Sequence, residues 1–319
     1  MSRVVAKGRF RVDRRRALEK LEKFQLEDPL RYVLEWLAAA VVDGAPRIEV
    51  RNDSDDFEIA WVGGPLGVGD LDALFDHVFG RPSDERQAVL QHLAVGVLGA
   101  LARSPRWLHL DVDGPEGPHR LAVDDPADCA AEVLPAKVGG LRCHVRDRLT
   151  QETALEALLW AFREPAEARL IRGAARWCPV PVVVNGTPLP PPAAPEGALV
   201  AWSDEDAALW VVPDESGHGV DVVRHGIVVH QLAMTLPPCR VVGWVRGDGV
   251  RLNASRSAVV DRDLAPVVKR LESAVDRLLI EALPSANKRR DEEVRWGERS
   301  LGFPRARARR GELIDALVV

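Results

Sequence analysis

The chain has 319 residues, 46% of them hydrophobic, and a formal net charge of −5 at pH 7. This length accommodates two domains that each bury a core, and the hydrophobic fraction excludes a wholly disordered protein. The mild negative charge argues against a nucleic-acid interface spread over the whole surface, although it leaves room for a local one.

The chain shows neither a targeting segment nor a cysteine framework. Its basic N-terminus has no apolar stretch of the signal-peptide kind, and the apolar run at 93–102 is about half the length that crossing a bilayer requires. We therefore expect a cytoplasmic protein without a membrane segment. The cysteines form no CxxC pair, which predicts isolated core thiols and no metal site. They are Cys129, Cys143, Cys178 and Cys239.

The first confident helix is predicted over residues 29–42. Its apolar residues recur every three or four positions, Asp28 is placed to cap it, and Pro29 fits the first helical position. From Leu34 onward the only charged side chain of this helix is Glu35. Burying a lone carboxylate is costly unless it has a partner or a task, so Glu35 needs an explanation.

The remainder of the first half alternates strands and helices. A Gly-rich loop, GGPLGVGD at 63–70, follows the first two predicted strands. The helix at 83–104 has a small, apolar second half and is expected to be buried, and the helix at 150–165 begins with a capping-box pattern. Strands are expected at 47–52, 57–62, 107–114, 119–125, 140–147 and 178–186, and a short helix at 70–79.

Proline density marks a boundary at 187–197, where a stiff linker is expected. Beyond it the strand pattern restarts, and a helix at 262–283 closes the second domain. Strands are expected at 198–202, 207–213, 219–225, 226–232 and 239–246. We predict an α+β chain with domains at 1–186 and 198–283, the linker between them, and a charged tail at 284–319.

The order of these elements resembles the GHKL nucleotide-binding domains, the superfamily of gyrase, heat shock protein 90, histidine kinases and MutL. LEWLAAAVVDGAPRIEV at 34–50 is similar to its first motif, Glu-x-x-x-Asn-x-x-Asp-Ala, with the Gly-Ala-Thr-Arg-Ile turn of MutL-like members. FEIAWVGGPLGVGDLDALF lies where the family has its Asp-x-Gly-x-Gly turn. LAVGVLGALARSPRWLHLDV lies where it has a Gly-rich phosphate-side loop and a strand.

The resemblance narrows to the heat shock protein 90 (HtpG-like) branch and spans about residues 20–283. Residues 137–186 resemble the end of that family's N-terminal domain, and 226–263 resemble its middle domain with the Leu-Asn-x-Ser-Arg signature at Leu252–Arg256. This implies a GHKL (Bergerat-type) α/β sandwich followed by a smaller α/β middle domain like ribosomal protein S5. It also implies ATP and Mg²⁺ as ligands where the pocket is intact.

The two family residues that act on the terminal phosphate of ATP have counterparts in this sequence. Glu35 matches the general base that activates water, and Arg256 matches the middle-domain arginine that reaches toward the γ-phosphate. The Mg²⁺-holding Asn is replaced by Ala39. Positions 35, 39 and 42 share one helical face. Val42 occupies the position of the motif's Asp, and Asp43 lies one residue further along the chain.

The adenine and phosphate-loop positions are mostly altered. Val62 replaces the Asp that accepts the adenine amino group, and Leu141 replaces the supporting threonine. Gly64 matches the first glycine of the Asp-x-Gly-x-Gly turn. The position of the second glycine is occupied by Leu66, unless a shift of one residue brings Gly67 there. In the phosphate loop Ala94 replaces the first glycine, while Gly96 and Gly99 are retained.

The resemblance therefore implies a degenerate ATP pocket and a chaperone-like or scaffolding module that binds a protein partner or client. An alternative is an active ATPase whose rearranged pocket uses Asp43, Gly64 and Gly67. A third option is a nucleic-acid-associated module of the MutL kind that uses the basic run at 305–310.

Plainer interpretations of the same residues stay open. Glu35 could pair with Arg31 or Arg47, or face solvent at the helix edge. Arg256 could form a structural salt bridge, and the loop at 63–70 could be an ordinary turn, because it lacks the lysine of a P-loop.

Overall fold

The computed structural model describes residues 28–148 and 164–278, apart from 196–197, 199, 213–218, 234, 237–238, 254–255 and 257. The chain divides into two compact units, Met1–Leu170 with Val183–Thr187, and Ile171–Val182 with Pro188–Val319. Most of the helix expected at 150–165 and the tail at 284–319 lie outside the described residues.

The first unit is built on an eight-stranded sheet of order β5-β4-β3-β6-β2-β1-β7-β8. The pairs from β5 through β1 along this path are antiparallel. The strands are β1 Ile48–Asn52, β2 Asp56–Trp61, β3 Trp107–Gly114, β4 Gly117–Ala122, β5 Ala131–Val133, β6 Leu141–Arg146, β7 Val182–Val184 and β8 Thr187–Pro188.

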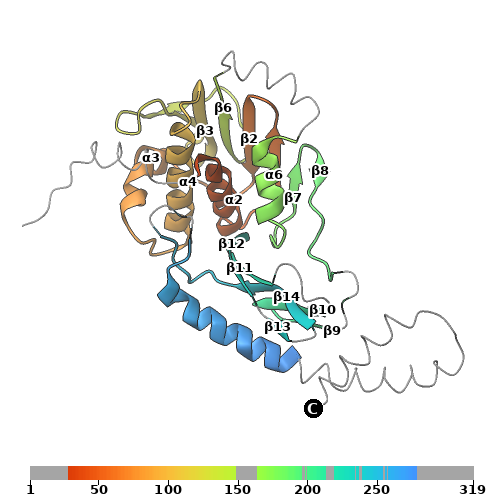
Figure 1. Ribbon diagram of the computed structural model, residues 1–319. Helices are drawn as coiled ribbons and strands as arrows, with labels where there is room; N and C mark the ends of the chain where they lie inside the picture. Colours follow the sequence, from red (N-terminus) through yellow and green to blue (C-terminus); the bar gives the residue numbers. More distant parts are fainter. Residues whose placement is uncertain are drawn as a thin grey trace, which may run out of the picture. The chain divides into compact units, whose positions relative to one another are not determined.

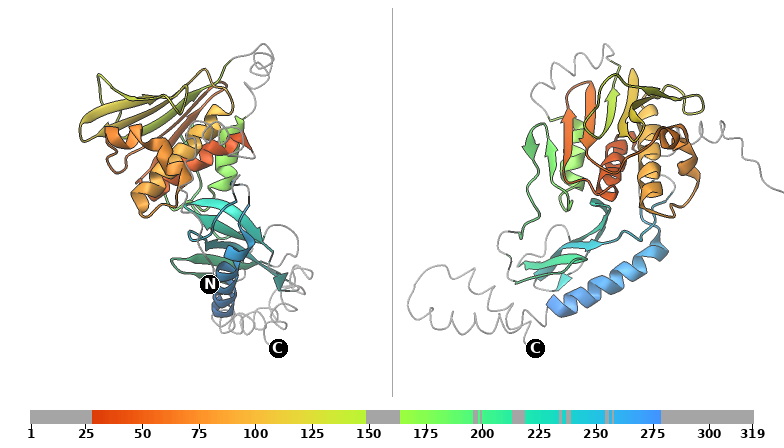
Figure 2. Two further views of the ribbon diagram at one scale, coloured as in Figure 1. Left: turned by 90° about the vertical axis from the view of Figure 1, so that its left-hand side faces the viewer. Right: turned by 180° about the vertical axis from the view of Figure 1, so that it is seen from behind.

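One face of this sheet carries the core and the helices. Burial alternates along β1, β2 and β6, as expected for strands with one apolar and one polar face. The helices lie on the apolar side, as Figures 1 and 2 show. They are α2 Tyr32–Val42, preceded by the 3-10 turn η1 Pro29–Arg31, then α3 Val68–Asp72, η2 Leu74–Phe79, α4 Glu85–Leu101 and α6 Ala166–Ala174.

The predicted helix at 29–42 is confirmed with its cap. The carboxylate of Asp28 accepts a hydrogen bond from the Leu30 N–H at 3.0 Å, and Pro29 occupies the first helical turn. α2 is buried from Tyr32 through Ala40, so its apolar composition reflects burial on every side. Its companion α4 begins at the cap Asp84 and is buried throughout its second half, as the sequence predicts.

An asparagine pair joins strand β1 to the turn that follows β7. The Asn52 N–H donates to the Asn185 side-chain oxygen at 2.8 Å, and the Asn185 amide returns a hydrogen bond to the Asn52 carbonyl. The Asn52 side-chain oxygen also accepts from the Ala168 N–H in α6. Asn52 is buried, so its full set of partners ties β1, the turn after β7 and the start of α6 together.

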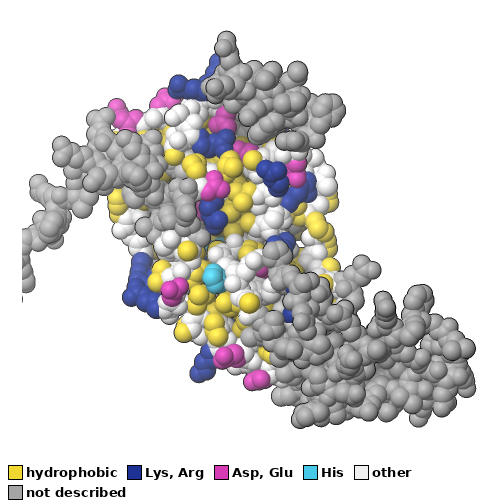
Figure 3. Space-filling model, viewed as in Figure 1, with side chains coloured by type: hydrophobic (Ala, Val, Ile, Leu, Met, Phe, Trp, Pro, Cys, Tyr) yellow, Lys and Arg dark blue, Asp and Glu magenta, His cyan; other side chains and the backbone are white. Residues whose placement is uncertain are grey.

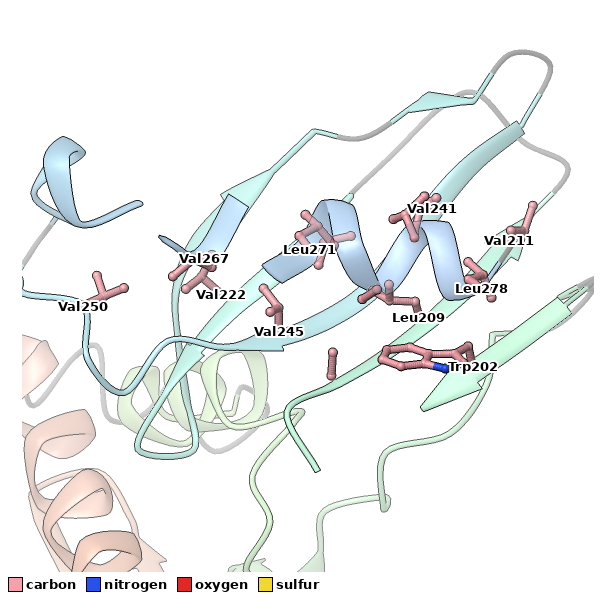
Figure 4. Close-up of a cluster of buried hydrophobic side chains, with 14 of the residues drawn as sticks. Trp202, Leu209, Val211, Val222, Val241, Val245, Val250, Val267, Leu271 and Leu278 are labelled. Carbon is pink, nitrogen blue, oxygen red and sulfur yellow. The ribbon is translucent and has the colours of Figure 1, made fainter. Parts of the chain in front are cut away.

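The second unit contains a six-stranded sheet, in which β12-β11-β14-β10-β9 follow one another and β13 pairs with β14. A helix at 264–278 packs its apolar side on one face of this sheet, where Leu271 and Leu278 meet Leu209, Val241 and Val245 (Figure 4). The strands are β9 Val200–Ser203, β10 Ala207–Val212, β11 Val220–Arg224, β12 Ile227–Leu232, β13 Thr235–Leu236 and β14 Cys239–Arg246.

The structure thus confirms a mixed α+β chain and adds elements that the sequence did not predict. β5 and β13 are too short for a periodic pattern, and α6 was overlooked although Ala168, Ile171 and Ala175 are buried at helical spacing. The strand expected at 178–186 shortens to β7, because the prolines before it supply no N–H to a ladder. Cys143 and Cys178 are buried free thiols, as expected.

Candidate functional site

The side chain of Glu35 meets a histidine in the core of the first unit. Its Oε2 lies 2.8 Å from Nδ1 of His92, which belongs to α4. Glu35 is only 7% exposed and His92 only 2%, so a solvent-facing position for Glu35 is wrong. A buried carboxylate needs such a partner, and the histidine supplies it from the second helix.

Next to this pair, a tryptophan fills the space between the two helices. The Trp36 ring lies so close to Gly96 that a Cβ placed on that glycine would be 2.4 Å from Cδ1 and Nε1 of the indole. The indole N–H donates to the Leu93 carbonyl at 3.4 Å, and Trp36 is fully buried. Gly96 therefore serves the close approach of α2 and α4.

The residues that the resemblance aligns with a phosphate loop lie inside a helix. α4 runs without a break from Glu85 to Leu101, so Ala94, Gly96 and Gly99 are buried helical residues of its second half. Backbone N–H groups within a helix bond to carbonyls of the preceding turn and do not point at an anion. The helix predicted over 83–104 is therefore confirmed here, and the Gly-rich loop that the resemblance implies after residue 93 is a continuous helix instead.

The position that the resemblance assigns to Mg²⁺ is apolar and buried. Ala39 is fully buried in α2 and supplies no oxygen ligand, while Val42 at the end of that helix is half-buried. Mg²⁺ needs oxygen ligands in octahedral geometry, so these residues do not fit the ion that the resemblance implies. Among the residues that the structure describes, no group of three or more His, Cys, Asp or Glu side chains is arranged to hold a metal ion.

Asp43 is brought to the turn after β2, where both of its oxygens accept hydrogen bonds. Oδ2 accepts from the Trp61 indole at 2.8 Å and Oδ1 from the Gly64 N–H at 2.9 Å. A Cβ on Gly63 would overlap this carboxylate, so the glycine makes room for it. Burial raises the pKa of Asp43 above its ordinary value, and the two hydrogen bonds offset part of that rise.

The remaining adenine-side positions do not converge on one point. Val62 is 60% exposed, whereas Leu141 lies opposite Trp61 in the sheet and is buried with the core. Gly67 is the N-cap of α3, and its N–H donates to the Asp70 carboxylate at 2.7 Å. Val62 cannot accept a hydrogen bond through its side chain, so the acceptor for an adenine amino group is missing at that position.

Arg256 belongs to the second unit, in a tight loop after the second sheet. Its backbone is left-handed, with φ of 51°, which is uncommon for a residue with a Cβ. Its N–H donates to the Asn253 carbonyl at 3.0 Å, and the Asn253 side chain accepts from the Ala258 N–H. Arg251 fixes the start of the loop through two hydrogen bonds to Asp263.

The sheet face away from the helices carries a charged network. Asp111 on β3 accepts from Arg120 on β4 and from Arg142 on β6, with shortest distances of 2.7 and 2.6 Å. Glu58 on β2 lies within 3.8 Å of Arg142 and 3.5 Å of Arg51 on β1. Charges therefore alternate across β4, β3, β6, β2 and β1, an arrangement that stabilises neighbouring strands.

An aromatic cluster adjoins this network. Trp107 stacks on His109 with ring centroids 4.5 Å apart, and meets the edge of His144 at the same distance. Nε2 of His144 lies 2.6 Å from the Asp56 carboxylate. Burial, followed by the charge of Arg120, lowers the pKa of His109, so its stacked ring is neutral near pH 7.

No single-sign patch dominates the face shown in Figure 3, where Lys and Arg side chains lie among Asp and Glu. The basic run at 305–310 lies outside the described residues. Within the parts of the chain that the structure describes, none of the helices has the length and apolar content that crossing a membrane requires.

The sequence did not predict His92 or Trp36 as part of this site. A signal was present, because His92 interrupts an apolar helical stretch just as Glu35 does in its own helix. A polar side chain buried in a helix needs a polar partner, and Glu35 and His92 supply one to each other.

No protein-family model matches the sequence, and the search of curated proteins finds no significant match.

Proposed function

We propose that the chain is a heat-shock-protein-90-like GHKL protein without ATPase chemistry, which acts as a chaperone-like or scaffolding module for a protein partner. The motif order supports the family, and a layer of helices on one face of an eight-stranded sheet, followed by a second α/β unit, is compatible with its GHKL sandwich and S5-like middle domain. Fold alone does not set function, so the proposal depends on the site.

One observation carries the loss of ATP chemistry. The two helices that carry the positions matched to the catalytic base and the phosphate loop, α2 and α4, meet directly through the Glu35–His92 contact and through Trp36 against Gly96. The positions that would hold metal and adenine, Ala39 and Val62, offer no ligand atoms. Each missing charge-assisted contact removes about 1.5–3 kcal/mol of binding free energy. Since about 1.4 kcal/mol corresponds to a tenfold change in affinity, each loss weakens ATP binding at least about tenfold.

Isothermal titration of the full chain with millimolar Mg-ATP tests this loss. We expect no heat beyond dilution. Binding at micromolar concentration would refute the proposal.

The partner-binding half of the proposal needs a separate test. We expect the chain to suppress heat-induced aggregation of a model client, followed by light scattering, to the same extent with and without ATP. Aggregation that is unchanged by the chain, or suppression that requires ATP, would each count against a nucleotide-independent chaperone-like module.

A second candidate is an active ATPase with a rearranged pocket, and one contact favours it. Asp43 and Gly64, which that alternative uses together, do meet at 2.9 Å. Because the other oxygen of Asp43 is taken by the Trp61 indole, adenine would have to displace an internal hydrogen bond. Measurable turnover that disappears in Glu35→Ala, with the variant still folded, would establish this candidate over the first.

A further inference from the structure

No further inference is drawn: the strongest candidate, the half-buried Trp107–His109–His144 side-chain cluster on the open face of the first sheet, carries nothing because the neighbouring arginines on that face are already paired with carboxylates and nothing in the part of the chain that the structure describes shows what covers it.

Discussion

The carboxylate of Glu35 and the imidazole of His92 meet at 2.8 Å between helices α2 and α4, where both side chains are almost excluded from solvent. The contact joins two residues 57 positions apart in the sequence. It gives Glu35 a structural role that needs no substrate. In the proposed module, the residue that matches a catalytic base therefore holds two buried helices together.

Replacing His92 should destabilise the first unit strongly. In His92→Ala the Glu35 carboxylate loses its hydrogen bond to the imidazole, and removing one partner of a buried hydrogen bond costs about 1–3 kcal/mol. We expect a loss of this order in the free energy of unfolding, measured by urea titration at pH 7.

A double-mutant cycle separates the pair from the surrounding packing. We expect Glu35→Ala, His92→Ala and the double variant to give a coupling energy above about 1 kcal/mol, because residues in direct contact are not additive. Additive losses within about 0.5 kcal/mol would show that the contact contributes little.

Gly96 should tolerate no side chain. In Gly96→Ala the new methyl group would lie 2.4 Å from the Trp36 ring, so the indole or one of the helices has to move. Overpacking of a filled core costs typically about 1–3 kcal/mol, more than alanine gains from its helix propensity. The midpoint of urea unfolding should therefore fall.

Gly69 in α3 is the matched control for Gly96. It lies in a helix of the same unit, and a Cβ there would meet nothing within 4 Å. We expect Gly69→Ala to be neutral or stabilising by up to about 1 kcal/mol. Equal effects at the two positions would contradict the close contact between Trp36 and Gly96.

The secondary structure of the described residues followed from the sequence largely because most elements carry their own signals. The apolar spacing of 29–42 and the cap at Asp28 are local features, because each involves only residues that are near one another in the sequence. The closed α2–α4 interface did not follow, because it depends on three side chains from helices far apart in sequence. A glycine inside an apolar run predicts either a loop or a close helix contact, and only the position of Trp36 distinguishes the two.

The role of Asp43 was predicted only in part. The resemblance gives Asp43 a nucleotide-binding role only in the alternative with a rearranged pocket, together with Gly64 and Gly67. In the fold the same position places both oxygens on the turn itself, through the Trp61 indole and the Gly64 N–H. The direction of a side chain after a helix end depends on the backbone of that turn, which residue type alone does not determine.

Asp111 should make the first unit sensitive to acid. Burial alone would raise the pKa of this carboxyl, but the guanidinium groups of Arg120 and Arg142 lower it below its usual value. An aspartate in the unfolded chain has a pKa of about 3.9, so the native state binds this proton less tightly. The interaction of Asp111 with the two arginines therefore contributes stability above about pH 4, and this stability is lost as the pH falls through the lower pKa of the folded state.

The variant Asp111→Asn tests that linkage. At pH 7 it leaves two arginines without their shared counter-charge, and we expect a loss of about 2–3 kcal/mol. Below about pH 4 the gap between variant and wild type should narrow, because the wild type loses the same interaction by protonation. Urea unfolding at a series of pH values measures this gap, with the exposed Asp124→Asn as the control. A gap that stays constant down to pH 2 would contradict the assignment.

Arg103, just after the end of α4, should stabilise the first unit by pairing with two carboxylates. Its guanidinium pairs with Asp147, lies 2.9 Å from Glu167 Oε1, and sits 5.7 Å from the centre of the Tyr32 ring. Glu167 is only 6% exposed, so Arg103→Ala leaves a buried carboxylate without this cation. We expect a loss of about 3 kcal/mol in the free energy of unfolding, in the range for breaking one side of a buried ion pair.

A lysine at the same position distinguishes charge from geometry. Arg103→Lys keeps the positive charge but lacks the planar fork that reaches two carboxylates at once, so it should recover only part of the stability. The exposed Arg106, three positions along the chain, provides the control, and Arg106→Ala should change the unfolding free energy by less than about 0.5 kcal/mol. If Arg103→Ala were as mild as that control, the three contacts would be no more than surface pairings. A full recovery by lysine would instead mean that charge alone holds Asp147 and Glu167.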